Sequence, residues 1–221
     1  IKDFTWNVNA NVSYNKNEIT ELYNGITEYV ASDTGRMVAV GHPLGEFYLN
    51  RYAGVNPTNG DALWYTKDGE ITTEYNESDK VMLGKTHEAP WQGGFGTTLS
   101  WQGFSLSAQF TWVADRWMLN NDRVFQESNG LFSAYNQSKR MLYDRWKKPG
   151  DVTDIPRYGV TPQLDSRFLE DASFLRLKNL MLSYTFPQKW LQRTNFLSSA
   201  RIYAQGQNLL TFTSFTGMDP D

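Results

Sequence analysis

The sequence predicts an all-β fold, and more specifically part of a transmembrane antiparallel β-barrel with long extracellular loops. Three observations point to it. Residues 4–14 alternate between apolar and polar side chains without a break, which is the period of a strand with one apolar face. The alternation shifts by one residue at Gln102-Gly103, as a two-residue hairpin requires. Long and short connections take turns along the chain, as they do in outer-membrane barrels.

Composition excludes several classes of protein. No run of 18 apolar residues occurs, so no membrane-spanning helix is expected, whereas barrel strands alternate and leave the average composition polar. The formal net charge is only -3, so nucleic acid is not an expected partner. Without cysteine the chain has no disulfide, thiolate metal site or thiol nucleophile. Aromatic residues make up 15% of the chain and favour strands and interfaces.

The first predicted strand covers residues 4–14. At ~3.3 Å per residue and a tilt of roughly 40°, it would rise about 28 Å, close to the ~25 Å apolar band of a barrel. Its aromatic residues sit at the ends, where rings favour the lipid headgroups. A strand of a soluble sandwich alternates equally well, so this strand alone leaves both readings open. The residues of its apolar face are Phe4, Trp6, Val8, Ala10, Val12 and Tyr14.

The next stretch of the chain is irregular. Residues 15–34 read as a connection, and an irregular strand is expected at residues 47–52. The cluster GVNPTNG at residues 54–60 contains the Asn-Pro and Asn-Gly steps typical of turns. No core-forming period follows as far as Pro90, so residues 54–92 are expected to form a long loop.

Two pairs of strands complete the prediction. Residues 95–101 and 104–112 form the hairpin, and residues 180–186 and 200–212 form strands joined by a connection at residues 187–199. Between the pairs lies a second long loop, residues 113–170, with a possible short helix at residues 138–147. Long connections therefore alternate with short ones, and a soluble sandwich gives no reason for such sorting.

Several segments together resemble the C-terminal barrel region of SusC/RagA-type TonB-dependent outer-membrane transporters. The resemblance covers nearly the whole chain, and the segments occur in the family's order. The segments are WNVNANVSYNKNEI at 6–19, GHPLGEFY at 41–48, YAGVNPTNGD at 52–61, FLRLKNLMLSYTFPQKWL at 174–191 and SARIYAQGQNLLTFTSFTGMDPD at 199–221. The resemblance implies a barrel of about 22 strands, of which this chain would supply about six.

The resemblance also implies what accompanies the chain. Residues 1–221 would be the C-terminal portion of the barrel, without the plug domain and the closing strand, and would need the remainder of the same barrel to pair their edges. The expected location is the outer membrane of a Gram-negative cell, as a multi-pass β-barrel in contact with membrane lipid. The expected partners are a SusD-like surface lipoprotein, the TonB complex reached through the plug, and an oligosaccharide or peptide substrate.

A candidate substrate-binding segment is DRWMLNNDR at residues 115–123. It combines an aromatic ring with amides and charges, the mixture that stacks on and hydrogen-bonds to sugars. Packing between extracellular loops or against the lipoprotein is the alternative, and it is the preferred one. The candidate residues are Trp117, Asn120, Asn121, Asp122 and Arg123.

No catalytic constellation and no cofactor site is predicted. His42 and His87 lack neighbouring ligands at metal spacing. Asp68, Glu70, Glu74, Glu77 and Asp79 form a loose acidic set without the ordered spacing of a calcium loop. The glycines at residues 93–96 lead into a strand, so they do not form a phosphate cradle.

The sequence raises three hypotheses for the function of the protein. The first is a transport component that imports a nutrient with energy supplied through TonB and performs no covalent chemistry. The second is a soluble carbohydrate-binding β-sandwich, which would require two packed sheets. The third is a glycan-degrading enzyme, which lacks a pair of carboxylates that stand out as acid and base. The sequence favours the first.

Overall fold

A computed structural model describes residues 3–31, 35–132, 134–192 and 196–221. The chain divides into two compact units. The sheet unit comprises residues 1–15, 89–115 and 173–214, and the loop unit comprises residues 16–88, 116–172 and 215–221.

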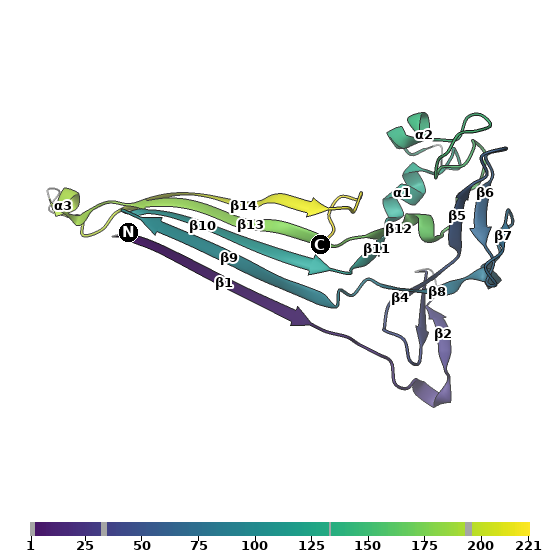
Figure 1. Cartoon of the computed structure of the whole chain (residues 1–221), viewed down its shortest axis with the longest axis horizontal. Coiled ribbons are helices and arrows are strands. Elements are labelled where there is room, and N and C mark those ends of the chain that lie inside the picture. The colour runs from purple at the N-terminus through teal and green to yellow at the C-terminus, as the bar shows by residue number, and fades with distance from the viewer. Residues whose placement is uncertain (1–2, 32–34, 133, 193–195) are drawn as a thin grey trace. The chain divides into compact units, whose positions relative to one another are not determined.

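The sheet unit is one antiparallel sheet of five long strands that lie side by side in sequence order (Figure 1). The strands are β1 (Phe4–Tyr14), β9 (Trp91–Trp101), β10 (Phe104–Ala114), β13 (Phe174–Thr185) and β14 (Arg201–Thr213). One short helix, α3 (Gln188–Leu191), lies in the connection between β13 and β14. The predicted all-β fold is confirmed, and within the described residues of this unit no second sheet packs on the first, as a sandwich would require.

The predicted hairpin is present. Trp101 pairs directly with Phe104, and the two residues between them have positive φ, 47° at Gln102 and 90° at Gly103. Two positive φ values define the turn whose twist matches the flanking strands. The shift in alternation at this point therefore reflects the turn itself.

The strand at residues 180–186 begins earlier than expected and contains a bulge. Its register with β10 shifts between Leu177 and Asn179, which leaves Lys178 as an extra residue. A single extra residue reverses the alternation. Leu175 and Leu177 consequently share a face with Leu180, although their numbers differ in parity.

One expected strand is not part of this sheet. The irregular strand at residues 47–52 lies in the loop unit as the ends of two short strands, and β1 pairs directly with β9 from Tyr14–Trp91 to Phe4–Trp101. The long sheet therefore has five strands in this chain where about six were expected. The two short strands are separated at Asn50, which forms an isolated bridge with Asp165.

The loop unit consists of short strands and single-turn helices. One sheet contains β2 (Glu28–Ala31), β3 (Arg36–Ala39), β4 (Glu46–Leu49) and β8 (Val81–Thr86); a second contains β5 (Arg51–Val55), β6 (Ala62–Tyr65) and β7 (Ile71–Thr72); a third contains β11 (Trp117–Leu119) and β12 (Leu169–Asp171). The helices are η1 (Tyr23–Gly25), η2 (Glu77–Asp79), α1 (Asn121–Gln126), α2 (Lys139–Tyr143) and η3 (Ser166–Phe168). Helix α2 falls inside the helix predicted at residues 138–147.

The two long loops expected at residues 54–92 and 113–170 are thus folded, and they pack on each other. The indole Nε1 of Trp64 donates to Asp165 Oδ2 at 2.8 Å, and the backbone N–H of Tyr52 donates to Ser166 Oγ at 2.9 Å. Leu83 of the first loop and Leu119 and Leu164 of the second pack against the same small core, which consists of Phe47, Leu49 and Leu169. The expectation of structureless loops was wrong because these strands are too short for alternation to show, and because the contacts between the two loops join residues more than a hundred positions apart.

No helix among the described residues is long and apolar enough to cross a membrane.

Replacing Gly103 by valine should destabilise the sheet. A Cβ atom at Gly103 would lie 2.7 Å from the carbonyl oxygen of Thr185, and the positive φ alone costs an L-residue about 1–2 kcal/mol. The free energy of unfolding of the full-length protein in detergent, measured with urea, should fall by at least that amount. The control Gln102→Asn should leave it unchanged, because Asn tolerates positive φ. If Gly103→Val is as stable as the wild type, the tight turn with a positive φ at Gly103 is contradicted.

Candidate functional site

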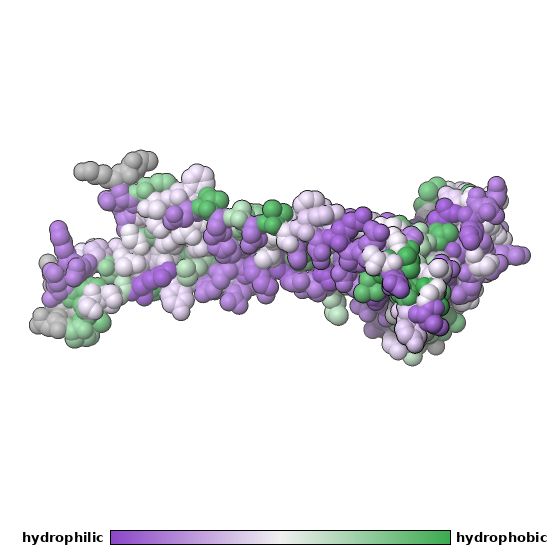
Figure 2. All heavy atoms as spheres, turned by 90° about the horizontal axis from the view of Figure 1, so that it is seen from below, coloured by the Kyte–Doolittle hydropathy of each residue, from purple (hydrophilic) through white to green (hydrophobic). Residues whose placement is uncertain are grey.

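The sheet unit has one apolar face and one polar face. The antiparallel register brings apolar residues of all five strands to the same side, and hydrophobic residues reach the surface at the end that carries α3 (Figure 2). Many of these side chains are exposed in this chain. Besides the face of β1, the apolar set comprises Trp91, Phe95, Leu99, Trp101, Phe104, Leu106, Phe110, Trp112, Leu175, Leu177, Leu180, Leu182, Tyr184, Ile202, Ala204, Leu210 and Phe212.

Aromatic rings mark both ends of the apolar face. At the end of the long connections, the ring centroids of Tyr14 and Trp91 lie 4.4 Å apart. At the end of the short turns, those of Phe104 and Tyr184 lie 4.6 Å apart. Two aromatic bands flanking an apolar zone are typical of strands that cross a lipid bilayer.

The polar face is rich in amides and hydroxyls. Gly94 and Gly96 leave room for neighbouring side chains to lie across the strand. Asn11 Oδ1 accepts a hydrogen bond from Gly94 N at 2.7 Å, and the amide of Gln109 occupies the space where a Cβ atom of Gly96 would lie. Such a face can hydrogen-bond to water or to a polar solute.

The predicted substrate-binding residues lie in β11 and at the start of α1, in the loop unit. Trp117 packs against the Phe47–Leu49–Leu169 core, and Lys85 Nζ lies 3.4 Å from its ring centroid. Asn120 is buried and caps α1, with Oδ1 accepting from Arg123 N at 3.2 Å. Asn121 and Asp122 are exposed in the first turn of α1. The segment therefore combines three residues with internal contacts and two that are accessible.

Arg123 belongs to a network of ion pairs that sequence reasoning missed. Its Nη1 donates to Glu170 Oε1 at 2.6 Å and its Nε donates to Glu127 Oε1 at 3.1 Å. Glu127, whose side chain is only 1% exposed, also accepts from Arg140 Nη1 at 2.6 Å. Arg140 donates from Nη2 to both carboxylate oxygens of Asp154, each at 2.7 Å. The network connects α1, α2 and β12.

The network shifts the pKa values of its members. Burial acts to raise the pKa of Glu170, but hydrogen bonds from Arg123 and Thr216 outweigh it, and the pKa lies below its ordinary value. For Asp154, burial is likewise outweighed, by Arg140, and the pKa is lowered. Two groups outside the network are shifted by burial. At Asp165, burial raises the pKa despite the hydrogen bond from Trp64. Burial also raises the pKa of Tyr75 to about 12.

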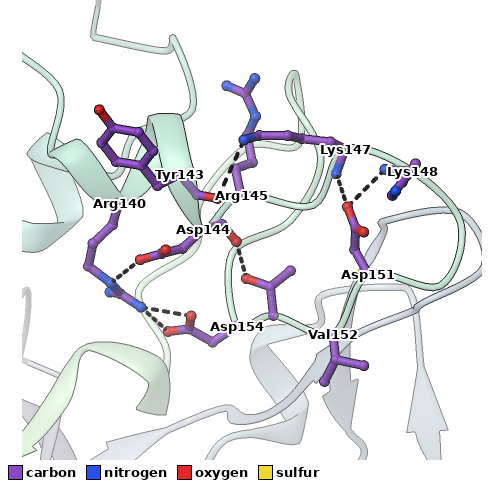
Figure 3. Close-up of a pocket in the computed structure, with 10 residues that line it drawn as sticks. Arg140, Tyr143, Asp144, Arg145, Lys147, Lys148, Asp151, Val152 and Asp154 are labelled. Atoms are coloured by element: carbon purple, nitrogen blue, oxygen red, sulfur yellow. Dashed lines mark hydrogen bonds and ion pairs between the residues drawn. The ribbon is translucent and has the colours of Figure 1, made fainter.

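A hollow of about 770 Å³ lies beside this network, between α2 and the segment that follows it (Figure 3). Three of its acidic groups are already engaged within the loop unit: Asp154 and Asp144 pair with Arg140, and Asp151 accepts from two backbone N–H groups at 3.0 Å. The only sequence signal for it is the dense run of charges in SKRMLYDRWKKPGD. Its lining is Arg140, Tyr143, Asp144, Arg145, Lys147, Lys148, Asp151, Val152, Thr153 and Asp154.

The two histidines have local partners. The Nδ1 atom of His42 lies 2.9 Å from Glu46 Oε2, and that of His87 lies 3.4 Å from the carbonyl oxygen of Gly45. Within the described part of the chain, no three His, Asp or Glu side chains gather at a distance suited to a metal ion.

Three known proteins resemble the chain over its whole length. The TonB-dependent receptor P3 of Formosa agariphila is 29% identical over 100% of this chain and 23% of its own length. The TonB-dependent receptor SusC of Bacteroides thetaiotaomicron is 25% identical, with 100% and 22% covered. A chain in the solved structure of the RagAB peptide transporter is 38% identical, with a TM-score of 0.93 and coverage of 100% and 25%. No protein-family model matches the chain.

The two-faced sheet and these similarities together define a segment of an outer-membrane β-barrel. The resemblance to SusC/RagA-type TonB-dependent transporters, predicted from the sequence, is confirmed. The chain spans about a quarter of the length of the relatives it matches.

Acidification should loosen the loop unit. Because the folded pKa of Glu170 lies below the ordinary value of 4.5, its carboxylate contributes stability above pH 4.5 that is lost as the pH falls through the lowered pKa. Asp154 acts in the same direction. Amide hydrogen exchange in residues 134–172, corrected for its intrinsic pH dependence, should accelerate between pH 5 and pH 3.

Glu170→Gln should already show part of this acceleration at pH 7, and a smaller further change on acidification. Asp122→Asn is the matched control, because Asp122 is exposed in the same region, and it should behave like the wild type. Exchange in Glu170→Gln that follows the wild type at every pH would show that the network does not stabilise the unit.

Proposed function

We propose that this chain forms part of the barrel wall, in the C-terminal portion, of a TonB-dependent outer-membrane transporter that imports oligosaccharides or peptides. The observation that carries the proposal is the division of the five-stranded sheet into an apolar and a polar face. The apolar face meets membrane lipid, and the polar face borders the path of the substrate. The proposed role is transport without covalent chemistry, so the protein acts as a transporter and not as an enzyme.

The partners follow from the same assignment. The remainder of the barrel pairs with the outer edges of β1 and β14, since a barrel leaves no strand edge unpaired in the membrane. The segments of the loop unit all leave the sheet at the end of its long connections, which is the extracellular end in outer-membrane barrels. A SusD-like lipoprotein would meet it there, and the TonB complex would act through the plug region.

Substrate contact in the segment from Trp117 to Arg123 is part of the proposal. Asn121 and Asp122 present accessible side chains, while Trp117, Asn120 and Arg123 would hold α1 in place. Similarity to the RagAB peptide transporter at 38% identity favours peptides. The family resemblance seen in the sequence leaves oligosaccharides as the second substrate class to be tested.

Deletion of the full-length gene, with and without complementation, tests the function. Growth should be lost on one of two probes supplied as the sole nutrient of its kind: a tryptic digest of casein or a mixture of malto-oligosaccharides. The complemented protein should partition with the outer membrane and require detergent for extraction, and inactivation of TonB should abolish the same growth. Extraction in aqueous buffer, or unchanged growth on both probes, would contradict the proposal.

A further inference from the structure

The apolar face of the sheet unit continues beyond the ends of the strands at the short-turn end. Ring centroids follow one another at 4.6 Å from Phe104 to Tyr184, 5.1 Å from Tyr184 to Phe186 and 6.3 Å from Phe186 to Trp190. The chain of rings thus leads from β10 across β13 into α3. A surface of this kind extends the lipid-facing side of the sheet into the connection between β13 and β14.

An apolar hollow of about 300 Å³ lies at the same end. Ala204, opposite Leu182 in the register of β13 and β14, is the smallest side chain of the lining and leaves room between its larger neighbours. Leu182 is 52% exposed and Ile202 is 63% exposed, so the hollow opens to the surroundings of the sheet. The lining residues are Phe104, Leu182, Ser183, Tyr184, Ile202, Tyr203 and Ala204.

Helix α3 presents an apolar and a cationic side chain next to each other. Leu191 is buried, whereas Trp190 is 59% exposed and Phe196, farther along the connection, is 81% exposed. Lys189 is exposed beside Trp190. Tryptophan favours the headgroup level of a bilayer, and lysine extends its ammonium group to the phosphates there.

We propose that this end of the sheet holds one phospholipid of the inner leaflet. An acyl chain lies in the hollow over Ala204, and Lys189 and Trp190 meet the headgroup. The phospholipid is the occupant because the hollow is continuous with the lipid-facing side of the sheet and lies at the end of the short turns, which face the periplasm in outer-membrane barrels. Hydrophobic residues are exposed at this end of the sheet unit, among hydrophilic ones (Figure 2). The inference rests on the proposed location in the outer membrane.

Native mass spectrometry of the full-length protein tests the site. The purified protein is delipidated and then exposed to dioleoylphosphatidylethanolamine in mixed detergent micelles. The wild type should retain one bound phospholipid. Ala204→Trp should fill the hollow and lose that species, and the control Ala10→Trp, which places the same side chain on the same face in β1, should retain it. Trp190→Ala should release the lipid at lower collision energy.

The retained gel mobility of the unheated barrel shows independently that each variant is folded. If Ala204→Trp does not fold, Trp190→Ala decides: lipid release identical to the wild type overturns the proposal. A wild type that retains no phospholipid, or equal loss in Ala10→Trp and Ala204→Trp, also overturns it. Failure of this proposal is distinguishable from failure of the proposed function. Lipid binding is measured on a protein that requires detergent, whereas the proposed function fails if the parent protein is extracted without detergent.

Discussion

Side-chain alternation, held in register by antiparallel hydrogen bonds across five strands, is the constraint on which the sheet unit depends. In each strand the position of a residue decides whether its side chain lies on the apolar or on the polar face of the sheet. In β13 the apolar residues change from odd to even numbers between Leu177 and Leu180. Lys178 forms a bulge at this point, and the bulge keeps Leu175 and Leu177 on the apolar face. In β14 the register shifts again opposite this point, next to Asn208, which has a positive φ of 51°. Both strands thus adjust locally and keep the two faces intact.

The loop unit depends on a different constraint, the satisfaction of buried polar groups. Glu127 and Asp165 are each 1% exposed. Glu127 accepts from Arg123 of its own helix and from Arg140 of α2, and Asp165 accepts from Trp64, which lies in a distant segment. Removing one partner of a buried ion pair typically costs about 3–5 kcal/mol, because it leaves the other charge unpaired. The network therefore fixes how α1, α2 and β12 meet, and with them the exposed first turn of α1.

Much of the sheet unit can be predicted from the sequence, and little of the loop unit. Strand β1 shows its alternation over eleven residues, and the hairpin at Gln102-Gly103 shows both its turn and its phase. The bulge at Lys178 hid the first half of β13, because the parity of its leucines changes there. In the loop unit the strands contain two to six residues, too few for a period to stand out. Contacts such as the one between Trp64 and Asp165 join residues 101 positions apart, and no local sequence pattern predicts them.

The candidate segment at residues 115–123 illustrates the same limit. Its composition indicates binding, yet composition does not distinguish a side chain that meets a substrate from one that meets its own protein. Asn120 and Arg123 hold internal partners, and only the fold reveals that Asn121 and Asp122 are the accessible members. Trp117 packs against the Phe47–Leu49–Leu169 core, an internal contact of the kind that the preferred alternative, packing between loops, expects.

Cysteine scanning of β1 tests the two-faced sheet most directly. The sequence contains no cysteine, so single cysteines can be placed along β1 of the full-length protein in intact outer membranes. A water-soluble maleimide should label Thr5→Cys, Asn7→Cys, Asn9→Cys and Asn11→Cys on the polar face. It should spare Trp6→Cys, Val8→Cys, Ala10→Cys and Val12→Cys, which face lipid. Uniform labelling, or labelling of the second set in place of the first, would contradict the assignment of the faces.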